Sequence, residues 1–275
     1  METETQALVH KASDTLLVAA GEDALFEAKE LVGAALGCGV KGLQAVKEIT
    51  QEQRECIAAM LQRRLAREPL QYILGEWAFM GLPFRVGPEA LIPRQDTETL
   101  VEAALKLARE RQYTTALDLC CGTGCIGIAL AKLGGLSVTA TDISPDCVRL
   151  TNENAMQNGV MLQTRCGDLF ELITGRYDMI VTNPPYLTNL DMAMLQPELR
   201  YEPKTALFGG QDGLDIYRRI KAAYQSCLLP GGALLMEVGA GQAAQVTALF
   251  EGGTTLCDLN GIERVVVIEP GEAGA

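Results

Sequence analysis

The sequence has 275 residues, 48% of them hydrophobic, and 35 acidic against 23 basic residues give a formal net charge of −12. This length and composition suffice for a full hydrophobic core and predict two domains. No apolar stretch approaches the roughly 18 residues of a membrane span, and no targeting segment is evident, so we expect neither a membrane protein nor a secreted one. The acidic charge argues against a nucleic-acid substrate, because duplex binding usually requires a basic surface.

Cysteine and histidine usage narrows the chemistry further. Nine cysteines are spread along the chain without paired spacing, which indicates reduced thiols and a cytoplasmic location. Cys120, Cys121 and Cys125 lie close together, but no histidine is nearby, so no metal site is predicted. The only histidine, His10, falls in an expected N-terminal helix, and a histidine-based catalytic triad is therefore not expected.

The first part of the chain, residues 1–74, is predicted to be a small helical bundle. Apolar residues recur there at three- and four-residue spacing, which is typical of amphipathic helices. Thr50 and Gln53 form a plausible capping box at the start of one of them. The expected helices are Thr3 to Ala20, Ala24 to Leu36 and Thr50 to Ala66.

The remainder of the chain is predicted to be a short linker followed by an α/β domain. Residues 75–92 form the linker, with a hairpin from Trp77 to Val86 that turns around Gly81-Leu82-Pro83. From residue 93 to 275, helical and strand patterns alternate, which implies a parallel sheet. The expected strands are Thr115 to Leu119, Ser137 to Thr141, Met161 to Cys166, Met179 to Thr182 and Ala233 to Val238, and then an antiparallel hairpin of Thr254 to Leu259 and Glu263 to Ile268 around Asn260-Gly261.

A candidate cofactor loop follows the first of these strands. The run Cys120-Cys121-Gly122-Thr123-Gly124 reads as a tight turn between a strand and a helix from Ile126 to Lys132. Asp142 ends the next strand, roughly 20 positions beyond the loop, where a carboxylate can bind ribose hydroxyls. Only part of the three-glycine dinucleotide fingerprint is present and no second nucleotide half is evident, which favours S-adenosylmethionine over a nicotinamide cofactor.

A candidate acceptor site follows the strand Met179 to Thr182. Asn183-Pro184-Pro185-Tyr186 offers a planar –NH2 group two hydrogen-bond acceptors, the Asn183 side-chain oxygen and the Pro184 carbonyl. The two prolines stiffen the turn, and Tyr186 can stack on the flat group. An amide or adenine nitrogen is a poor nucleophile and must be held in position, so this turn is typical of nitrogen methylation.

These motifs together resemble the HemK-type protein-(glutamine-N5) methyltransferases, which modify peptide chain release factors. The resemblance extends over nearly the whole chain. Cys120 departs from the family pattern, because it replaces the first glycine of the usual Asp-x-Gly-x-Gly-x-Gly loop. Besides the cofactor loop and the acceptor turn, the matching stretches are Pro69 to Gly75, Leu91 to Glu98, Glu202 to Leu207, Gly209 to Leu214 and Gly231 to Glu237.

The resemblance implies a class I S-adenosylmethionine-dependent methyltransferase with a Rossmann-like sheet and an N-terminal helical bundle. The implied reaction is transfer of a methyl group to the glutamine of the Gly-Gly-Gln motif of release factors. Asp168 matches the second usual acid of the family, and with Leu169 it is expected to border the adenine ring. The resemblance assigns the grip on the protein substrate to the N-terminal bundle and the hairpin.

Other functions remain open on the sequence alone. An adenine-N6 nucleic-acid methyltransferase would use the same acceptor turn, but it would need a basic binding surface. A methyltransferase that modifies a ribosomal-protein glutamine would differ in its N-terminal domain. A non-catalytic cofactor-binding module would require a broken loop or a broken acceptor turn, and both are intact in this sequence.

Overall fold

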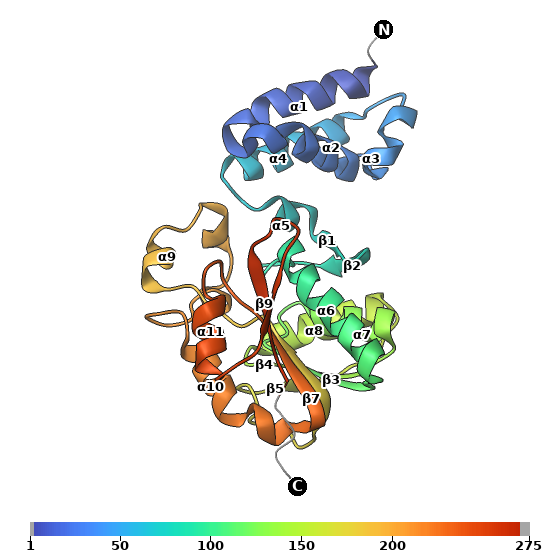
Figure 1. The fold of residues 1–275 in the computed structure, drawn as a ribbon. Coiled ribbons are helices and arrows are strands. Elements are labelled where there is room, and N and C mark those ends of the chain that lie inside the picture. Colours follow the sequence, from blue (N-terminus) through green and yellow to red (C-terminus); the bar gives the residue numbers. More distant parts are fainter. Residues whose placement is uncertain (1–2, 270–275) are drawn as a thin grey trace. The chain divides into compact units, whose positions relative to one another are not determined.

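The computed structural model describes residues 3–269, which divide into two compact units (Figure 1). The first unit comprises the chain up to Glu76 together with Gln196–Tyr201. The second comprises Trp77–Leu195 and the chain from Glu202 onward. The short segment Gln196–Tyr201 therefore belongs to the helical unit, although its sequence pattern does not separate it from the surrounding α/β domain.

The first unit is a bundle of helices, as its apolar periodicity indicates. Leu16, Leu31 and Ile57 are buried between the three long helices. The predicted capping box is confirmed, because Thr50 Oγ1 accepts from the Gln53 amide and Gln53 Oε1 accepts from the Thr50 amide. The helices are α1 (Glu4–Ala20), α2 (Ala24–Ala35), α3 (Gly39–Gly42), α4 (Gln51–Leu65) and α5 (Leu70–Leu74), with short 3-10 turns at Gly21–Asp23 and Leu43–Ala45.

A buried ion-pair cluster holds the Gln196–Tyr201 segment in the first unit. Arg64 Nε lies 2.7 Å from Glu27 Oε2, and Arg64 Nη1 lies 3.0 Å from Glu198 Oε1. The Tyr201 hydroxyl donates to the Ala66 carbonyl at 2.8 Å. A buried arginine is costly unless its charge is paired, so these carboxylates explain why this segment associates with the helices.

A two-stranded hairpin, β1 (Glu76–Phe79) and β2 (Leu82–Arg85), follows the helices, and all of it except Glu76 belongs to the second unit. Its turn lies at Met80 and Gly81, one residue before the predicted position, and Leu82 and Pro83 belong to β2. Both turn residues have positive φ, 51° and 72°, which is the conformation of the tightest hairpin connections. The Glu98 carboxylate accepts from the Met80 amide at 2.6 Å and secures the turn.

The main sheet has seven strands in the order β5-β4-β3-β6-β7-β9-β8. Its first five strands are parallel, whereas β9 runs antiparallel to β7 and β8 runs antiparallel to β9, as the sequence predicted. The strands are β3 (Thr115–Leu119), β4 (Ser137–Asp142), β5 (Gln163–Cys166), β6 (Tyr177–Thr182), β7 (Leu228–Glu237), β8 (Thr254–Cys257) and β9 (Glu263–Ile268).

Helices cover both faces of this sheet (Figure 1). Leu100 and Ile128 share one hydrophobic core with Val181, and Tyr217 shares the other with Ile180. Neighbouring residues of a strand point to opposite faces, which is why Ile180 and Val181 enter different cores. The helices are α6 (Gln95–Arg111), α7 (Cys125–Gly134), α8 (Pro145–Gln157), α9 (Asn189–Ala193), α10 (Asp215–Ala223) and α11 (Ala243–Leu249), with 3-10 turns at Lys204–Ala206 and Tyr224–Cys227. A further 3-10 turn, Glu198–Tyr201, belongs to the first unit.

The order of the strands creates a switch point between β3 and β6. From β3 the chain proceeds through β4 to β5 on one side, whereas β6 and β7 lie on the other side. Leu119 pairs with Thr182, so the residues that follow these two strands emerge next to each other. In open α/β sheets, ligands bind outside the carboxyl ends of the strands at such a point.

Candidate active site

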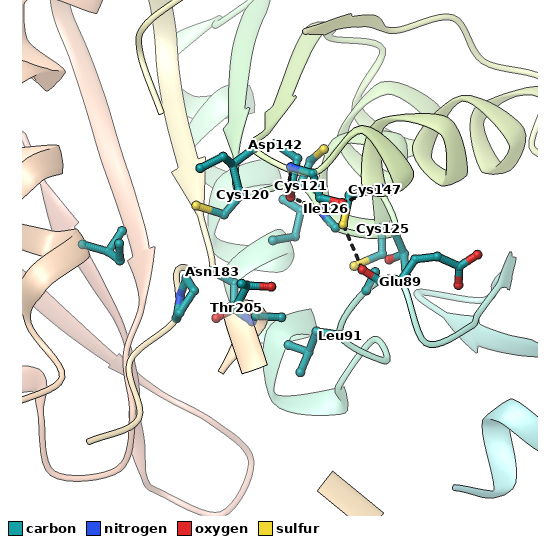
Figure 2. Close-up of a pocket in the computed structure, with 18 of the residues that line it drawn as sticks. Glu89, Leu91, Cys120, Cys121, Cys125, Ile126, Asp142, Cys147, Asn183 and Thr205 are labelled. Carbon is teal, nitrogen blue, oxygen red and sulfur yellow. Dashed lines mark hydrogen bonds between the residues drawn. The ribbon is translucent and has the colours of Figure 1, made fainter. Parts of the chain in front are cut away.

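A cavity of about 390 Å³ lies at the carboxyl ends of β3, β4 and β6. Its volume is within the usual range of small-molecule sites. Figure 2 shows Asp142 and the cysteine-rich loop at one end of the cavity and Leu91 at the other. The sequence-predicted residues that line it are Cys120, Cys121, Gly122, Thr123, Asp142, Asp168, Leu169, Asn183 and Pro185, whereas Gly124, Pro184 and Tyr186 do not line it.

The loop after β3 has a backbone that needs residues tolerant of positive φ. Cys120, Gly122 and Gly124 have φ of 58°, 54° and 80°. Cys120 therefore holds a conformation that suits glycine better, in agreement with the glycine of the family pattern at this position. A Cβ on Gly124 would lie 2.7 Å from Thr151 Cγ2, so this glycine is required for close packing at the start of α7 rather than for contact with the cavity.

Asp142 connects the loop to the end of β4. Its Oδ2 accepts from the Gly122 amide and its Oδ1 accepts from the Ser144 amide, both at 2.9 Å. Burial raises the pKa of this carboxyl, although these backbone amides partly offset the rise. The carboxylate is thereby fixed at the cavity wall, and each of its oxygens retains a lone pair for a ligand.

A second buried carboxyl, Asp118, lies beneath the loop and occupies the position of the acid that opens the family's loop pattern. Its Oδ2 accepts from the Gly127 amide at 2.9 Å, whereas its Oδ1 has no hydrogen-bond partner among residues 3–269. Burial raises its pKa to about 7, and the nearby charge of Asp142 adds to this rise. Asp118 thus supports the first turn of α7 from inside the protein and does not contact the cavity.

The Asn183 turn is held on several sides. Gln242 Nε2 donates to the Tyr186 carbonyl at 3.0 Å, and the Leu187 amide donates to the Leu207 carbonyl at 2.8 Å. Asn183 Nδ2 donates to Thr97 Oγ1 at 3.2 Å. Pro184 is buried, and burial raises the pKa of the Tyr186 phenol to about 12. The Asn183 side chain therefore lies at the cavity, while the aromatic ring of Tyr186 is directed into the protein core.

Two further wall segments are joined by Glu202. Its Oε2 accepts from the Ile92 amide at 3.0 Å, and its Oε1 forms a salt bridge with Arg94. These residues come from two stretches that the family resemblance had marked, Leu91 to Glu98 and Glu202 to Leu207. The contact between the two stretches could not be predicted, because nothing in the sequence of either one indicates that it binds the other.

No group of three or more His, Cys, Asp or Glu side chains arranged for a metal was found in the described part of the chain. The cysteines that line the cavity have no disulfide partners, and burial raises the pKa of Cys125 and of Cys147 to about 12 each. Thiols with such pKa values are protonated at neutral pH and are poor metal ligands and nucleophiles. Within residues 3–269, no helix is both long enough and apolar enough to span a membrane.

The seven-stranded sheet, its antiparallel tail and the cavity at the switch point define a class I methyltransferase. Solved structures share this fold at low sequence identity. The human Mettl16 catalytic domain in complex with an RNA hairpin aligns with a TM-score of 0.55 and 18% identity, over 78% of this chain and 81% of that one. A 16S rRNA N2 G1207 methyltransferase of T. thermophilus aligns with a TM-score of 0.52 and 19% identity, over 70% of this chain and 49% of that one.

Sequence comparisons identify the family. The Methyltransferase small domain matches residues 95–204, and the PrmC N-terminal domain matches residues 7–75. The release factor glutamine methyltransferase of Geobacter sulfurreducens is 44% identical over 89% of this chain and 89% of its own. That of Rhodospirillum rubrum is 38% identical over 99% of this chain and 89% of its own. The chain belongs to the release factor glutamine methyltransferase family, as its motifs predicted.

The cofactor of this class is S-adenosylmethionine, and the cavity fits it. A fixed carboxylate at Asp142 suits a ribose diol. Ile143 and Leu169 give the same wall an apolar surface of the kind that an adenine ring requires. A Cβ on Gly122 would meet only the Ala90 side chain, at 3.7 Å, so the backbone here is open to close approach by a ligand.

Proposed function

We propose that the protein methylates the side-chain amide nitrogen of the glutamine in the Gly-Gly-Gln motif of peptide chain release factors. Family membership supports the protein substrate, because relatives at 33–44% identity are named release factor glutamine methyltransferases. Such a substrate would place the enzyme in the cytoplasm, where translation occurs. When bound, S-adenosylmethionine supplies a methyl group made electrophilic by its sulfonium.

The position of Asn183 is the observation on which this proposal mainly rests. Its Nδ2 is engaged by Thr97, which leaves Oδ1 as the atom that can accept from a substrate at the cavity. An amide nitrogen has its lone pair delocalised, so it must be oriented before it can act as a nucleophile. Asn183 Oδ1 would accept one N–H of the glutamine amide and so turn the nitrogen toward the methyl donor.

The remaining predicted residues complete this proposal. The second N–H would be accepted by the backbone carbonyl of Pro184, and the buried turn holds that carbonyl in place through the bond from Gln242 to Tyr186. Tyr186 would contact the substrate only by its exposed edge, since its ring packs in the core. No residue is assigned as a base. After the transfer, the proton passes from the methylated amide nitrogen to water.

Cofactor binding is assigned to the other end of the cavity. Asp142 would accept the ribose hydroxyls, and the loop from Cys120 to Gly124 would lie against the cofactor through its backbone. Asp168 and Leu169 would border the adenine ring, with Asp168 held by an ion pair to Arg219. Cofactor and substrate nitrogen would therefore meet near Asn183.

The test is methyl transfer from labelled S-adenosylmethionine to intact release factors, followed by mapping of the labelled peptide. We expect one labelled residue, the glutamine of the Gly-Gly-Gln motif, and no label after that glutamine is substituted. Labelling of a ribosomal-protein glutamine instead would assign the enzyme to the related substrate class. Efficient labelling of DNA or RNA, with none of any release factor, would contradict the proposal and support adenine methylation.

A further inference from the structure

Thr97 and Glu237 both adjoin the Asn183 carboxamide. Thr97 also lines the cavity, whereas Glu237 does not. Thr97 belongs to the first turn of α6, and Glu237 ends β7, next to β6 in the sheet. Both are 2% exposed. The two residues come from distant parts of the sequence, and both interact with Asn183.

A carboxamide can be turned by 180° with little change in shape, so its orientation must be set by its neighbours. If Asn183 were flipped, its own two N–H donors would face the –NH2 group of the substrate, which also offers only donors. The productive orientation therefore requires acceptors on the Nδ2 side. Thr97 Oγ1, 3.2 Å from Asn183 Nδ2, is such an acceptor.

Glu237 places a buried carboxyl group next to these two side chains. Its Oε2 has no hydrogen-bond partner within the described residues, and such a buried acceptor attracts nearby donors. Burial raises the pKa of Glu237 to about 7, and hydrogen bonds from the side chains of Thr97 and Asn183 act against that rise. Arg264 also lowers this pKa, although it already contacts Asp96 at 2.8 Å and Asp258 at 3.2 Å.

We propose that Thr97 and Glu237 are positioning residues that lock the Asn183 carboxamide with its oxygen toward the substrate amide. The Thr97 hydroxyl accepts from Asn183 Nδ2 at 3.2 Å, and the side chains of Thr97 and Asn183 both favour the ionised form of the neighbouring Glu237 carboxyl. This inference rests on the proposed function, since it explains how the amide acceptor is prepared before the substrate binds.

The test compares Thr97→Val, which removes the hydroxyl at nearly constant size, with Thr97→Ser, which restores it. For Thr97→Val we expect kcat to fall about 10- to 100-fold. The affinity for S-adenosylhomocysteine and the melting temperature should change little. Thr97→Ser should recover most of the activity, a rescue that a purely steric role of the Thr97 methyl group would not give.

A double-mutant cycle separates this inference from the proposed function. If Thr97 acts through Asn183, then Thr97→Val should change the residual kcat of Asn183→Ala by less than about twofold. A full additional loss in that background, or a Thr97→Val single variant with normal kcat, would overturn the inference alone. Normal kcat of Asn183→Ala itself would instead overturn the role assigned to Asn183 in the proposed function.

Glu237→Gln probes the carboxylate in the same way. The amide that replaces it presents a donor as well as an acceptor, so the Asn183 carboxamide is no longer held in one orientation. We expect kcat to fall while the affinity for S-adenosylhomocysteine is kept, and the loss should again disappear in the Asn183→Ala background. Retention of full kcat by Glu237→Gln would remove Glu237 from the proposal.

Discussion

Arg219 and Asp168 form an ion pair at the edge of the cavity, with 2.7 Å between Arg219 Nη2 and Asp168 Oδ2. Both side chains line the cavity, so the carboxylate assigned to the adenine end already has a partner in α10. The two side chains remain 48% and 39% exposed, and a pair this exposed contributes at most about 1 kcal/mol. Arg219 therefore orients Asp168 without fixing it rigidly.

This pair predicts different effects of two substitutions on cofactor affinity. Asp168→Asn should weaken binding of S-adenosylhomocysteine about tenfold or more, because a hydrogen bond to a charged acceptor is lost. Arg219→Gln should weaken it only a few-fold. Calorimetric titration measures both. Equal losses in the two variants would show that Arg219 itself contacts the cofactor and that the assignment of Asp168 is incomplete.

Substitution of Asp142 should separate cofactor binding from chemistry. Asp142→Ala removes the proposed ribose acceptor and also the bonds to the Gly122 and Ser144 amides. We expect a large rise in the dissociation constant of S-adenosylmethionine but a much smaller change in kcat at saturating cofactor, because the carboxylate does not contact the reacting methyl group. Unchanged affinity, measured by titration calorimetry, would refute the assignment of Asp142.

Asn183→Ala should reduce activity while leaving the fold and the cofactor site intact. The lost group is a preoriented acceptor used in the transition state, and such losses cost about 2.7–4 kcal/mol, or a factor of about 100 to 1000 in kcat. Asn152→Ala is a matched control, since Asn152 on α8 is exposed and its carboxamide makes only surface bonds, from Nδ2 to the Val148 carbonyl and to Oδ1 from the Thr164 hydroxyl. Near-normal turnover of Asn183→Ala at normal stability would show that another group orients the substrate amide.

The buried Asp118 predicts a pH dependence of stability. Its pKa is about 7 in the folded protein against 3.8 in the unfolded chain, so the folded state keeps a proton that the unfolded state releases. Stability contributed by this group is therefore present at low pH and falls as pH rises from about 4 to about 7, by about 1.4 kcal/mol per pH unit within this window. Asp118→Asn keeps an acceptor for the Gly127 amide and should remove this loss.

Melting temperatures at pH 5 and pH 8 test the effect of Asp118. The stability of Asp118→Asn relative to the wild type should increase between these two pH values. Asp178→Asn serves as the control. Burial opposes ionisation of Asp178, but hydrogen bonds from Thr114 and Thr115 lower its pKa overall. The stability of Asp178→Asn relative to the wild type should therefore be the same at pH 5 and pH 8. If the stability of Asp118→Asn relative to the wild type were also the same at both pH values, Asp118 would have to be ionised in the folded protein from pH 5 to pH 8.

Much of the sheet could be predicted because apolar runs end directly in polar motifs. β3 and β9 have the predicted bounds, and the tail pairs antiparallel as expected. The predicted bounds of β7 were wrong, since Pro230-Gly231-Gly232 reads as a strand breaker but lies within the strand. A register shift beside Tyr177 accommodates it, and such an irregularity depends on the neighbouring strand rather than on local sequence.

The site could be predicted only where a residue lies in a motif that acts through local geometry. Asp142 and Asn183 each follow a strand, so their placement at the sheet edge was foreseeable. Glu237, Arg219 and Glu202 become relevant only through partners far away in the chain, Thr97, Asp168 and Arg94. No periodicity signals such pairs, because each member alone resembles an ordinary helix, strand or loop residue.

The helical unit is expected to hold the release factor through exposed apolar side chains. Leu17, Val18 and Phe26 lie at the end of α1 and the start of α2 and are 57%, 88% and 50% exposed. Exposed apolar side chains that gather into a patch are typical of protein-binding surfaces, and we expect these three to form one. Burial of one such side chain in a complex contributes about 1.5–3 kcal/mol, so Val18→Ser and Phe26→Ser should each raise KM for the release factor about tenfold or more.

The affinity for S-adenosylmethionine should stay unchanged, since the cavity belongs to the other unit. Met156→Ser, at an 82% exposed position of α8, is the control and should leave KM unchanged. Steady-state kinetics with an intact release factor measures these values, and normal KM in both Val18→Ser and Phe26→Ser would show that the release factor binds elsewhere.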